Sequence, residues 1–364
     1  MDFDLDKHTI FKTLAGSRSY GTETPTSDTD YRGIAIPPLE YVVGLRGFNQ
    51  YVRNEPDDIT IFALRKFVDL ALKCNPNVIE QLFVDERHIV KTTKWGEELR
   101  EKRQMFLSTR ALYTFTGYAM SQLKRIKRHK GWLMNPPKGM PSRYDYGLPE
   151  QTLIPKDQLG AAMTLMQRHL HEHIPSLTAA DNYGRGQFWE GLATVLSLYA
   201  ETRGISFSES EEWPDTQEEV LLAAGRDLGF SADFLTLLAK EKSYSTSKRE
   251  WKQYSDWVKN RNPARAELEA RYGYDCKHAM HLVRLMRMGR EILEDGELVV
   301  FRPDRHELLE IRNGAWSYEA LIDWAEGQDK ELKRISKTSV LPKTPDEKAV
   351  QEMLIRFTLE FNGR

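Results

Sequence analysis

The chain has 364 residues, of which 40% are hydrophobic and 29% are charged, enough for one large domain or two moderate ones. Its net charge of -2 argues against a uniformly basic nucleic-acid-binding protein, and its two distant cysteines argue against a disulfide framework or a Cys-x-x-Cys zinc site. No apolar run approaches the roughly 18 to 20 residues of a membrane helix, and the acidic N-terminus does not resemble a signal peptide, so a cytoplasmic protein without membrane contact is expected.

The first part of the chain has a mixed α/β pattern. Three short strands are predicted from β-forming residues bounded by glycine, proline or polar turns: 9–15, 31–36 and 59–62. Two helices are predicted to follow, from apolar spacing and from a proline suited to a first helical turn: 64–72 and 76–84.

Strand signals almost vanish after about residue 95, and helical spacing predominates. Helices are predicted over 95–104, 108–128, 157–172, 186–203, 216–227, 231–241, 247–261, 263–271, 275–294, 317–340 and 345–360. Proline and glycine make 131–141 a predicted loop. We therefore expect an α+β protein with a small mixed-sheet module, a large helical domain and a C-terminal helix of unassigned role: residues 1–95, 96–340 and 341–364.

Two aspartates shortly after a Gly16-Ser17 turn are the strongest chemical signal in the sequence. Alternate residues of a strand point to the same face, so Asp28 and Asp30 can aim two carboxylates at one site. Such oxygen ligands suit Mg²⁺, and the turn could present backbone N–H groups and the Ser17 hydroxyl to a triphosphate. Alone, an Asp-x-Asp pair in a turn is more often ordinary loop chemistry; its spacing from Gly16-Ser17 makes a phosphoryl-transfer site the better interpretation.

These residues resemble the signature of the DNA polymerase β superfamily of nucleotidyltransferases, which is Gly-Ser, a spacer of this size and Asp-x-Asp. The chain looks most like the branch called RNA-ligase-associated polymerase-like proteins, with bacterial and phage members. The resemblance covers roughly residues 10–325 and rests on four further segments: Leu64-Arg65-Lys66-Phe67, Asn75-Pro76-Asn77-Val78-Ile79-Glu80, Arg261-Asn262-Pro263-Ala264-Arg265, and the run from Gly273 to Leu285.

The resemblance implies a third metal-binding carboxylate on a neighbouring strand. Asp58 matches that position best, which gives Asp28, Asp30 and Asp58 as catalytic residues and as ligands of Mg²⁺ or Mn²⁺. Asp57 and Glu80 remain alternatives, because a slip of one residue in a strand reverses the direction in which a side chain faces. The alternative to a metal-binding role is that Asp57 and Asp58 are a solvated pair in a turn.

Several basic residues are candidates for contacts with the nucleotide. Arg18 and Arg32 flank the aspartates, and either could contact phosphate or lie on the surface. Lys66 opens a helix, where its charge opposes the helix dipole, which disfavours a purely structural role. The nucleotide-binding set expected in this module is Gly16, Ser17, Arg18 and Lys66.

A basic stripe is predicted on the helix that begins near residue 275. Lys277, His281 and Arg284 fall at i, i+4 and i+7 and so share one face. We interpret them as contacts to the phosphates across the carboxylate cleft, although such stripes are more often solvated helix faces.

The densest basic run precedes Trp132 and several tyrosines, a combination suited to single-stranded nucleic acid. Its candidate nucleic-acid contacts are Lys124, Arg125, Lys127, Arg128 and Lys130. The same charges also favour a helix C-terminus without any ligand.

The sequence thus predicts a metal-dependent nucleotidyltransferase that moves a nucleoside monophosphate from a nucleoside triphosphate to an acceptor hydroxyl. An RNA end, in repair or end modification, is the first choice of acceptor. Modification of a protein or small molecule and a catalytically silent nucleotide-binding regulator are the alternatives. No protein partner is indicated.

Overall fold

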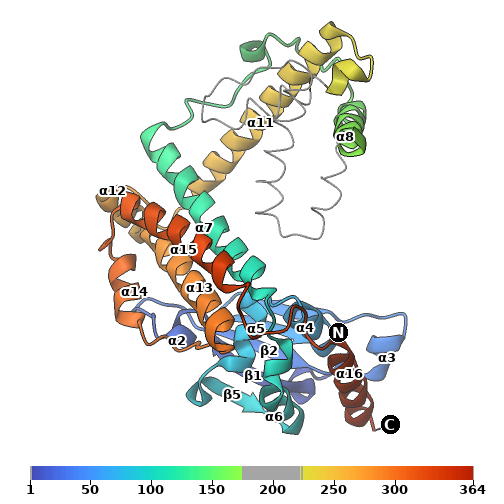
Figure 1. Ribbon diagram of the computed structural model, residues 1–364, viewed down its shortest axis with the longest axis vertical. Coiled ribbons are helices and arrows are strands. Elements are labelled where there is room, and N and C mark those ends of the chain that lie inside the picture. The colour runs from blue at the N-terminus through green and yellow to red at the C-terminus, as the bar shows by residue number, and fades with distance from the viewer. Residues whose placement is uncertain (1, 174–221, 223, 364) are drawn as a thin grey trace. The chain divides into compact units, whose positions relative to one another are not determined.

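The computed structural model describes residues 2–173, 222 and 224–363. Contacts divide the chain into two compact units (Figure 1). The first unit combines Met1–Lys130 with Ala264–Arg364, and the second unit is Gly131–Pro263. These boundaries differ from those predicted at 95 and 340, because helices from the end of the chain join the N-terminal module.

A five-stranded sheet forms the centre of the first unit, with the order β3-β4-β2-β1-β5. Its strands are β1 (Thr9–Ala15), β2 (Asp30–Ala35), β3 (Gln50–Arg53), β4 (Asp58–Ala63) and β5 (Ile89–Thr92). β2 and β4 run parallel, whereas the other neighbours are antiparallel. This small mixed sheet, together with the helices that follow it, confirms the predicted α+β class.

The three predicted strands are present, but the sequence analysis missed the two outer strands, β3 and β5. Each has only four residues and no fully buried side chain. Edge strands of this kind have one unpaired side and little apolar patterning, so the sequence carries a weak signal for them.

Helices cover the sheet. The N-terminal module contributes α1 (Leu5–His8), α2 (Gly16–Tyr20), α3 (Leu39–Val43), α4 (Leu64–Ala71), α5 (Pro76–Phe83), α6 (Lys94–Glu101) and α7 (Ala111–Met134). The later part contributes α12 (Pro263–Tyr272), α13 (Cys276–Asp295), α14 (Arg305–Arg312), α15 (Tyr318–Ile335) and α16 (Glu347–Phe361). One continuous hydrophobic core includes Ile34 of β2, Phe67 of α4 and Leu282 of α13, so segments more than 200 residues apart fold together.

The central helix of this later part is α13, which packs against α14 and α15 (Figure 1). Its first turn is capped by the side chain of Asp275, which accepts a hydrogen bond from the His278 backbone N–H. It ends at Gly296, whose φ of 68° is the left-handed conformation that glycine adopts at a helix end. Most of its circumference is buried, so little of α13 is a solvated face.

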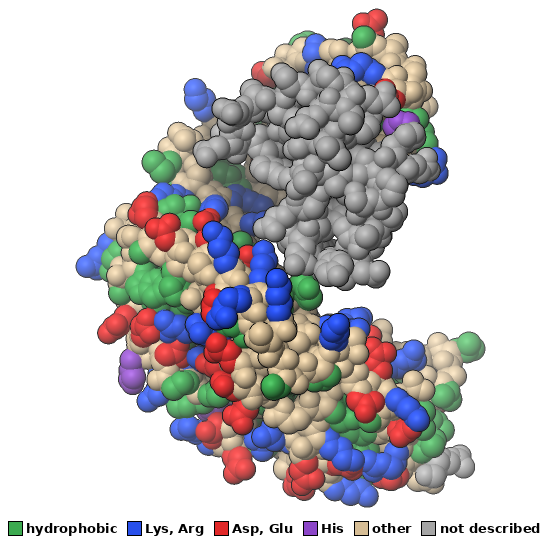
Figure 2. All heavy atoms as spheres, in the orientation of Figure 1, with side chains coloured by type: hydrophobic (Ala, Val, Ile, Leu, Met, Phe, Trp, Pro, Cys, Tyr) green, Lys and Arg blue, Asp and Glu red, His purple; other side chains and the backbone are tan. Residues whose placement is uncertain are grey.

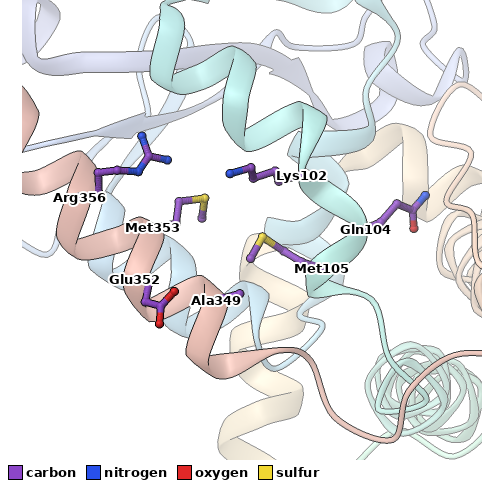
Figure 3. Close-up of a pocket in the computed structure, with 7 residues that line it drawn as sticks. All are labelled: Lys102, Gln104, Met105, Ala349, Glu352, Met353 and Arg356. Atoms are coloured by element: carbon purple, nitrogen blue, oxygen red, sulfur yellow. The ribbon is translucent and has the colours of Figure 1, made fainter.

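The C-terminal helix α16, predicted over 345–360, packs on the N-terminal module. The Leu39 backbone N–H donates to the Asn362 side chain over 3.0 Å. The Phe361 ring meets the Trp95 ring edge-on at 4.9 Å. Arg356 pairs with Glu98 of α6. Next to this contact is a groove of about 600 Å³, lined by residues of α16 and of the segment 102–105 (Figure 3).

The described part of the second unit is helical. It includes the last residues of α7, a short 3₁₀ turn, α8 (Lys156–His173) and α11 (Ala232–Asn260). Two differences from the predicted pattern stand out. The helices expected over 231–241 and 247–261 form the single helix α11, and α7 continues through Met134 into the segment expected to be a loop. Asn135-Pro136 then follows α7, as expected where proline disfavours further helix. The helix predicted over 186–203, and most of that over 216–227, lies outside the described residues.

An ion pair and an aromatic cluster stabilise this helical unit. Arg143 donates two hydrogen bonds to the buried Glu241 carboxylate of α11, at 2.5 and 3.0 Å. The Trp132 ring lies 5.7 Å from the Tyr254 ring and 5.4 Å from the Trp257 ring. The aromatic residue that follows the basic run is therefore packed against α11.

Candidate functional site

The turn after β1 is built around the carboxylate of Asp30. Gly16 has a φ of 62°, a conformation that favours glycine. A Cβ atom at this position would lie 1.9 Å from Asp30 Oδ2, so any larger residue would displace the carboxylate. The next residue, Ser17, is half-buried in the first turn of α2. The Gly-Ser turn therefore packs directly against the carboxylate of Asp30.

Asp30 and Asp58 are register partners on the parallel strands β2 and β4. Neighbouring strands lie about 4.8 Å apart and partner side chains share a face, so the two carboxylates are adjacent. The Asp58 backbone N–H donates to Thr29 O over 3.2 Å, which fixes this register at the start of β4. Asp28 is exposed, two residues before Asp30.

The ionisation of Asp30 is influenced by burial and by charged neighbours. The pKa of Asp30 is raised above its ordinary value, first by burial and then by the negative charge of Asp28, with Asp58 acting in the same direction. The cations Arg32 and Lys277 act in the opposite direction. The Asp30 carboxylate is therefore affected by neighbouring negative charge, and a bound cation would stabilise its ionised form.

The two arginines near the aspartates have different contacts. Arg32 Nη1 lies 3.5 Å from Asp58 Oδ1 and donates to Thr60 Oγ1 over 3.3 Å. Arg18 instead donates to the backbone carbonyls of Ser27 and Asp28, at 3.2 and 3.3 Å. In this structure Arg18 holds the loop that carries Asp28, which is a different contact from the predicted one to phosphate.

The alternatives for the third carboxylate are separated by the geometry. Asp58 stands opposite Asp30 in the ladder, whereas Asp57 precedes the strand. Glu80 of α5 is buried, and its carboxylate accepts a hydrogen bond from the Tyr20 hydroxyl at 2.5 Å and one from Arg284 Nη1 at 2.9 Å. Of the three, Asp58 has the position that faces Asp30.

The predicted basic stripe of α13 divides into residues with different surroundings. Burial lowers the pKa of Lys277, and so do the nearby cations Arg265 and Arg312, whereas the charge of Asp28 raises it. The charge of Asp28 thus acts on Lys277, and the phosphate contact of Lys277 stays a prediction. Burial holds the pKa of His281 well below its ordinary value, with Arg284 and Lys277 acting in the same direction.

Arg284, the third member of the stripe, is a core residue. It is 5% exposed, pairs with Glu80, and lies with its guanidinium carbon 3.7 Å from the centre of the Tyr20 ring. The expected phosphate contact is therefore not the contact made here. Helical spacing located Arg284 on the same face as Lys277, but at this depth the face is covered by α2 and α5.

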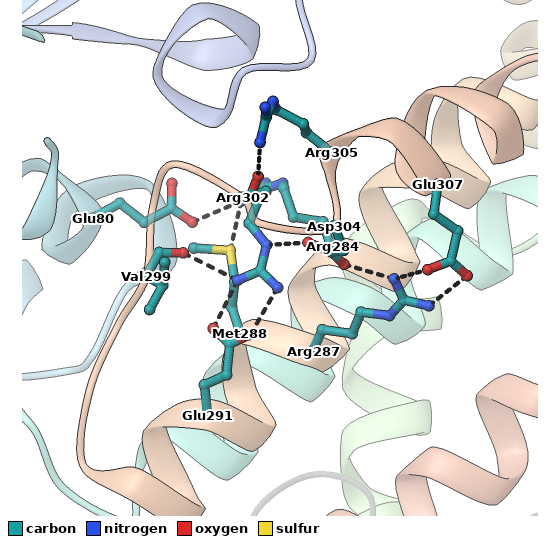
Figure 4. A network of polar contacts seen from close by, with 10 residues as sticks. All are labelled: Glu80, Arg284, Arg287, Met288, Glu291, Val299, Arg302, Asp304, Arg305 and Glu307. Atoms are coloured by element: carbon teal, nitrogen blue, oxygen red, sulfur yellow. Dashed lines mark hydrogen bonds and ion pairs between the residues drawn. The ribbon is translucent and has the colours of Figure 1, made fainter.

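Further ion pairs extend from Arg284 along α13 and the segment after it (Figure 4). Arg302 donates two hydrogen bonds of 2.7 Å from Nη1 and Nη2 to the Glu291 carboxylate. Its Nε donates to Asp304 Oδ1 over 2.8 Å. Its backbone N–H donates to Tyr20 O at the end of α2, over 3.1 Å. These contacts fasten the short helix after Gly16 to the C-terminal half of the first unit.

The structure does not bring Lys66 to the carboxylates. Asp58 begins β4, whereas Lys66 follows the other end of that strand, in the first turn of α4. Five steps of about 3.3 Å along β4 separate the two ends by about 16 Å.

The basic run lies on α7, and part of it faces acidic residues of α15. Lys127 Nζ lies 3.8 Å from Glu326, and Lys130 Nζ lies 3.5 Å from Glu319. Lys124, Arg125 and Arg128 are exposed. On the face of the first unit seen in Figure 2, basic and acidic side chains are interspersed.

One buried polar cluster had no recognisable sequence motif. His129 Nδ1 lies 3.7 Å from Asp275 Oδ2 and 4.0 Å from Glu269 Oε1, and these ligand atoms are close enough together to hold a cation. However, Asp275 already lies 2.6 Å from His278 Nδ1 and 3.7 Å from Arg265 Nη1. Burial opposes its ionisation, but hydrogen bonds from His129 and His278 hold the pKa of Asp275 well below its ordinary value. The cluster joins α7, α12 and α13 and fixes the helix turn that carries Lys277.

Comparison with known proteins finds similarity in the segment that contains these residues. A family model described as the RNA repair pathway DNA polymerase beta family matches residues 4–134, which include the turn and all three aspartates. Over these residues the chain is similar to this polymerase β family. The resemblance predicted from Gly16-Ser17 and the aspartates is thereby confirmed.

A phage protein also resembles part of the chain. The chain is 26% identical over 130 residues to an uncharacterized 38.9 kDa protein of the nrdC-mobD intergenic region of Enterobacteria phage T4, which covers 32% of this chain. The match spans 38% of the phage protein's length. No solved structure matches the chain. Among the described residues there is no helix with the length and apolar character needed to span a membrane.

Proposed function

We propose that this protein is a metal-dependent nucleotidyltransferase that transfers a nucleoside monophosphate from a nucleoside triphosphate to an acceptor hydroxyl. The observation that carries the proposal is the register pair of Asp30 and Asp58 beside the Gly16 turn. Two carboxylates on one face, with Asp28 close by, can bind a cation next to backbone N–H groups able to meet phosphate. The family match over this segment supports the same reaction class.

The residues present fit a divalent cation such as Mg²⁺ or Mn²⁺. Asp28, Asp30 and Asp58 supply the hard oxygen ligands that these ions prefer. Burial and then the charge of Asp28 raise the pKa of Asp30, and a positive ion would relieve the repulsion between the carboxylates. When bound, the ion supplies charge neutralisation at the phosphates.

The chain's own residues supply binding and proton transfer. The turn at Gly16 and Ser17 would bind the triphosphate, with Lys277 adding a positive charge from α13. The Asp58 carboxylate would accept the proton of the acceptor hydroxyl. The hydroxyl oxygen then forms a bond to the α-phosphorus, the α–β phosphoanhydride bond breaks, and pyrophosphate leaves.

An RNA end is the acceptor that we favour. The matched family is described as part of RNA repair, and Lys124 and Arg125 present exposed positive charge on α7. Incubation with each labelled triphosphate, Mg²⁺ and a pool of RNA ends tests this choice. Label on RNA that Asp30→Asn abolishes and Asp57→Asn does not would support it.

Two other outcomes would indicate the alternatives. Label on a protein or a small molecule would indicate a nucleotidyltransferase with another acceptor, as expected if the mixed charge of α7 does not bind RNA. Tight triphosphate binding without transfer to any acceptor would indicate a nucleotide-binding regulator. The intact set of three aspartates favours the enzyme over the regulator, because binding alone does not require Asp58 to face Asp30.

A further inference from the structure

The long helix α11 of the second unit has an exposed basic stripe (Figure 1). Lys248, Lys252 and Lys259 fall at i, i+4 and i+11, so they lie on one face of the helix, and all three are exposed. Arg249, beside the first lysine, is exposed as well. Along the helix axis the second lysine is about 6 Å from the first, and the third is about 10 Å further on.

The charges of this α11 stripe are not neutralised by neighbouring acids. Within the described part of the chain, none of the three lysines and not Arg249 makes an ion pair. Asp256 borders the stripe but forms no ion pair with it. On α7, by contrast, Lys127 and Lys130 lie close to glutamates of α15. The positive charge of α11 is therefore available to an anionic partner.

Aromatic side chains alternate with these lysines. Trp251 follows Lys248 by three residues, is half-buried, and makes no ring contact with another of the described residues. The Tyr244 ring, one helical turn before Lys248, has its centre 5.6 Å from Lys248 Nζ. Basic residues interleaved with aromatic rings suit single-stranded nucleic acid, because the cations meet its phosphates and the rings stack on its bases.

We propose that this face of α11 binds single-stranded RNA, with the three lysines at its phosphates and Trp251 against a base. The inference rests on the proposed function, because it takes the bound strand to be the RNA whose end is the acceptor. The surface is separate from the contacts predicted on α7. Charge and stacking hold a strand without reading its sequence, so RNA ends of different sequence are bound alike.

Neutralising two lysines tests the electrostatic part. Fluorescence anisotropy of a labelled single-stranded RNA of about 16 nucleotides, within the range that such surfaces cover, would give dissociation constants for the full chain at several salt concentrations. Lys248→Gln with Lys252→Gln should weaken binding about tenfold or more. The slope of log affinity against log salt should become shallower by about 1.4, since each lost phosphate contact contributes about 0.7 for a single strand.

A matched control makes the same change of net charge elsewhere. Lys343→Gln with Lys348→Gln alters two exposed lysines of the first unit and should leave both affinity and slope unchanged. Trp251→Leu should weaken binding about fivefold or more without changing the salt slope, because it removes stacking and no charge. Thermal melting would establish that each variant is folded, and the exposed lysines keep the test valid if Trp251→Leu is not.

The outcomes separate this inference from the proposed function. Wild-type affinity and salt slope in the folded α11 lysine variant would overturn the inference and leave the stripe a solvated helix face. Tighter binding of a DNA strand of the same sequence would overturn RNA as the partner. Transfer of label from a triphosphate is measured separately. A protein that binds RNA through α11 but transfers no label would refute the proposed function and keep the RNA-binding surface.

Discussion

Arg284 and Glu80 form a buried ion pair across 204 positions of sequence, with Nη1 of the arginine 2.9 Å from Oε1 of the glutamate. The same glutamate accepts the hydroxyl hydrogen of Tyr20, whose ring lies under the guanidinium. Because Tyr20 ends the short helix that begins at Gly16, the pair connects α13 to the turn beside the carboxylates. We therefore regard Arg284 as a residue that positions the turn.

Removing one partner of this pair should destabilise the protein strongly. Arg284→Met leaves the Glu80 charge buried without its cation, and loss of one member of a buried pair costs about 3 to 5 kcal/mol. Urea denaturation would measure the free energy of unfolding. Arg290→Ala is the matched control, since Arg290 makes an i,i+4 pair with Glu294 at a partly exposed position, and it should cost about 0.5 kcal/mol or less. Two results together would contradict the buried pair. They are a small effect of Arg284→Met on the free energy of unfolding, and no recovery of that free energy in Glu80→Gln or in the double variant.

Neutralising Asp30 should separate stability from activity. The pKa of Asp30 is raised, so its ionised form costs folding free energy at a pH above that value. Asp30→Asn removes this cost, and the metal-free protein at pH 7 should melt at the same temperature or higher. The difference should shrink as the pH falls toward about 4, where aspartate is protonated in the unfolded chain too. Nucleotide transfer should fall by about 100-fold or more. Transfer at the wild-type rate would show that Asp30 is not part of the site.

The two neighbouring aspartates before β4 should respond unequally. Asp58→Asn removes the carboxylate opposite Asp30 and should lower the transfer rate by about 100-fold. Asp57→Asn, one residue earlier, should be nearly silent and is the matched control. Single-turnover rates at saturating triphosphate would compare them. The opposite ranking would mean that the strand register at the site differs from the one described.

Lys277 should contribute to triphosphate binding from the helical part of the chain. A charged contact to phosphate is worth about 1.5 to 3 kcal/mol, so Lys277→Ala should weaken binding about tenfold or more. Arg290→Ala, on the same helix, should leave the affinity unchanged. Titration of each variant with triphosphate and Mg²⁺ would measure the difference. Equal affinities in both variants would restrict the nucleotide to the N-terminal module.

His281 should make stability depend on pH below neutrality. Its pKa is held well below the ordinary 6.5, first by burial and then by Arg284, Lys277, His278 and Arg265. A histidine that is neutral in the folded protein stabilises the fold above its unfolded pKa, and this contribution is lost as the pH falls below about 6.5. Melting temperatures between pH 7.5 and 5.5 should therefore drop less in His281→Gln than in the wild type. The exposed His306→Gln should follow the wild type, and a His281 variant that does the same would contradict the burial of the neutral ring.

The local sequence was sufficient to predict the part of the candidate site that depends on neighbouring residues. Gly16 and the Asp28–Asp30 spacing predict a turn and two convergent carboxylates, because positive φ favours glycine and because strand side chains alternate. The strands and helices nearest the site were predicted for the same reason. The edge strands β3 and β5 were missed, since four-residue strands with exposed faces leave almost no pattern.

Only the tertiary structure decided which distant residues complete the site. Asp58 stands opposite Asp30 because β2 and β4 pair in parallel in one register, and a register depends on the packing of the whole sheet. Helical spacing put Lys277 and Arg284 on one face of α13, but it does not say what covers that face. The charge of Asp28 acts on Lys277, whereas Arg284 is enclosed by Glu80 and Tyr20. The sequence by itself therefore determined which residues form the N-terminal turn and its aspartates, and only the packing of α13 decided that Arg284 is a buried partner of Glu80.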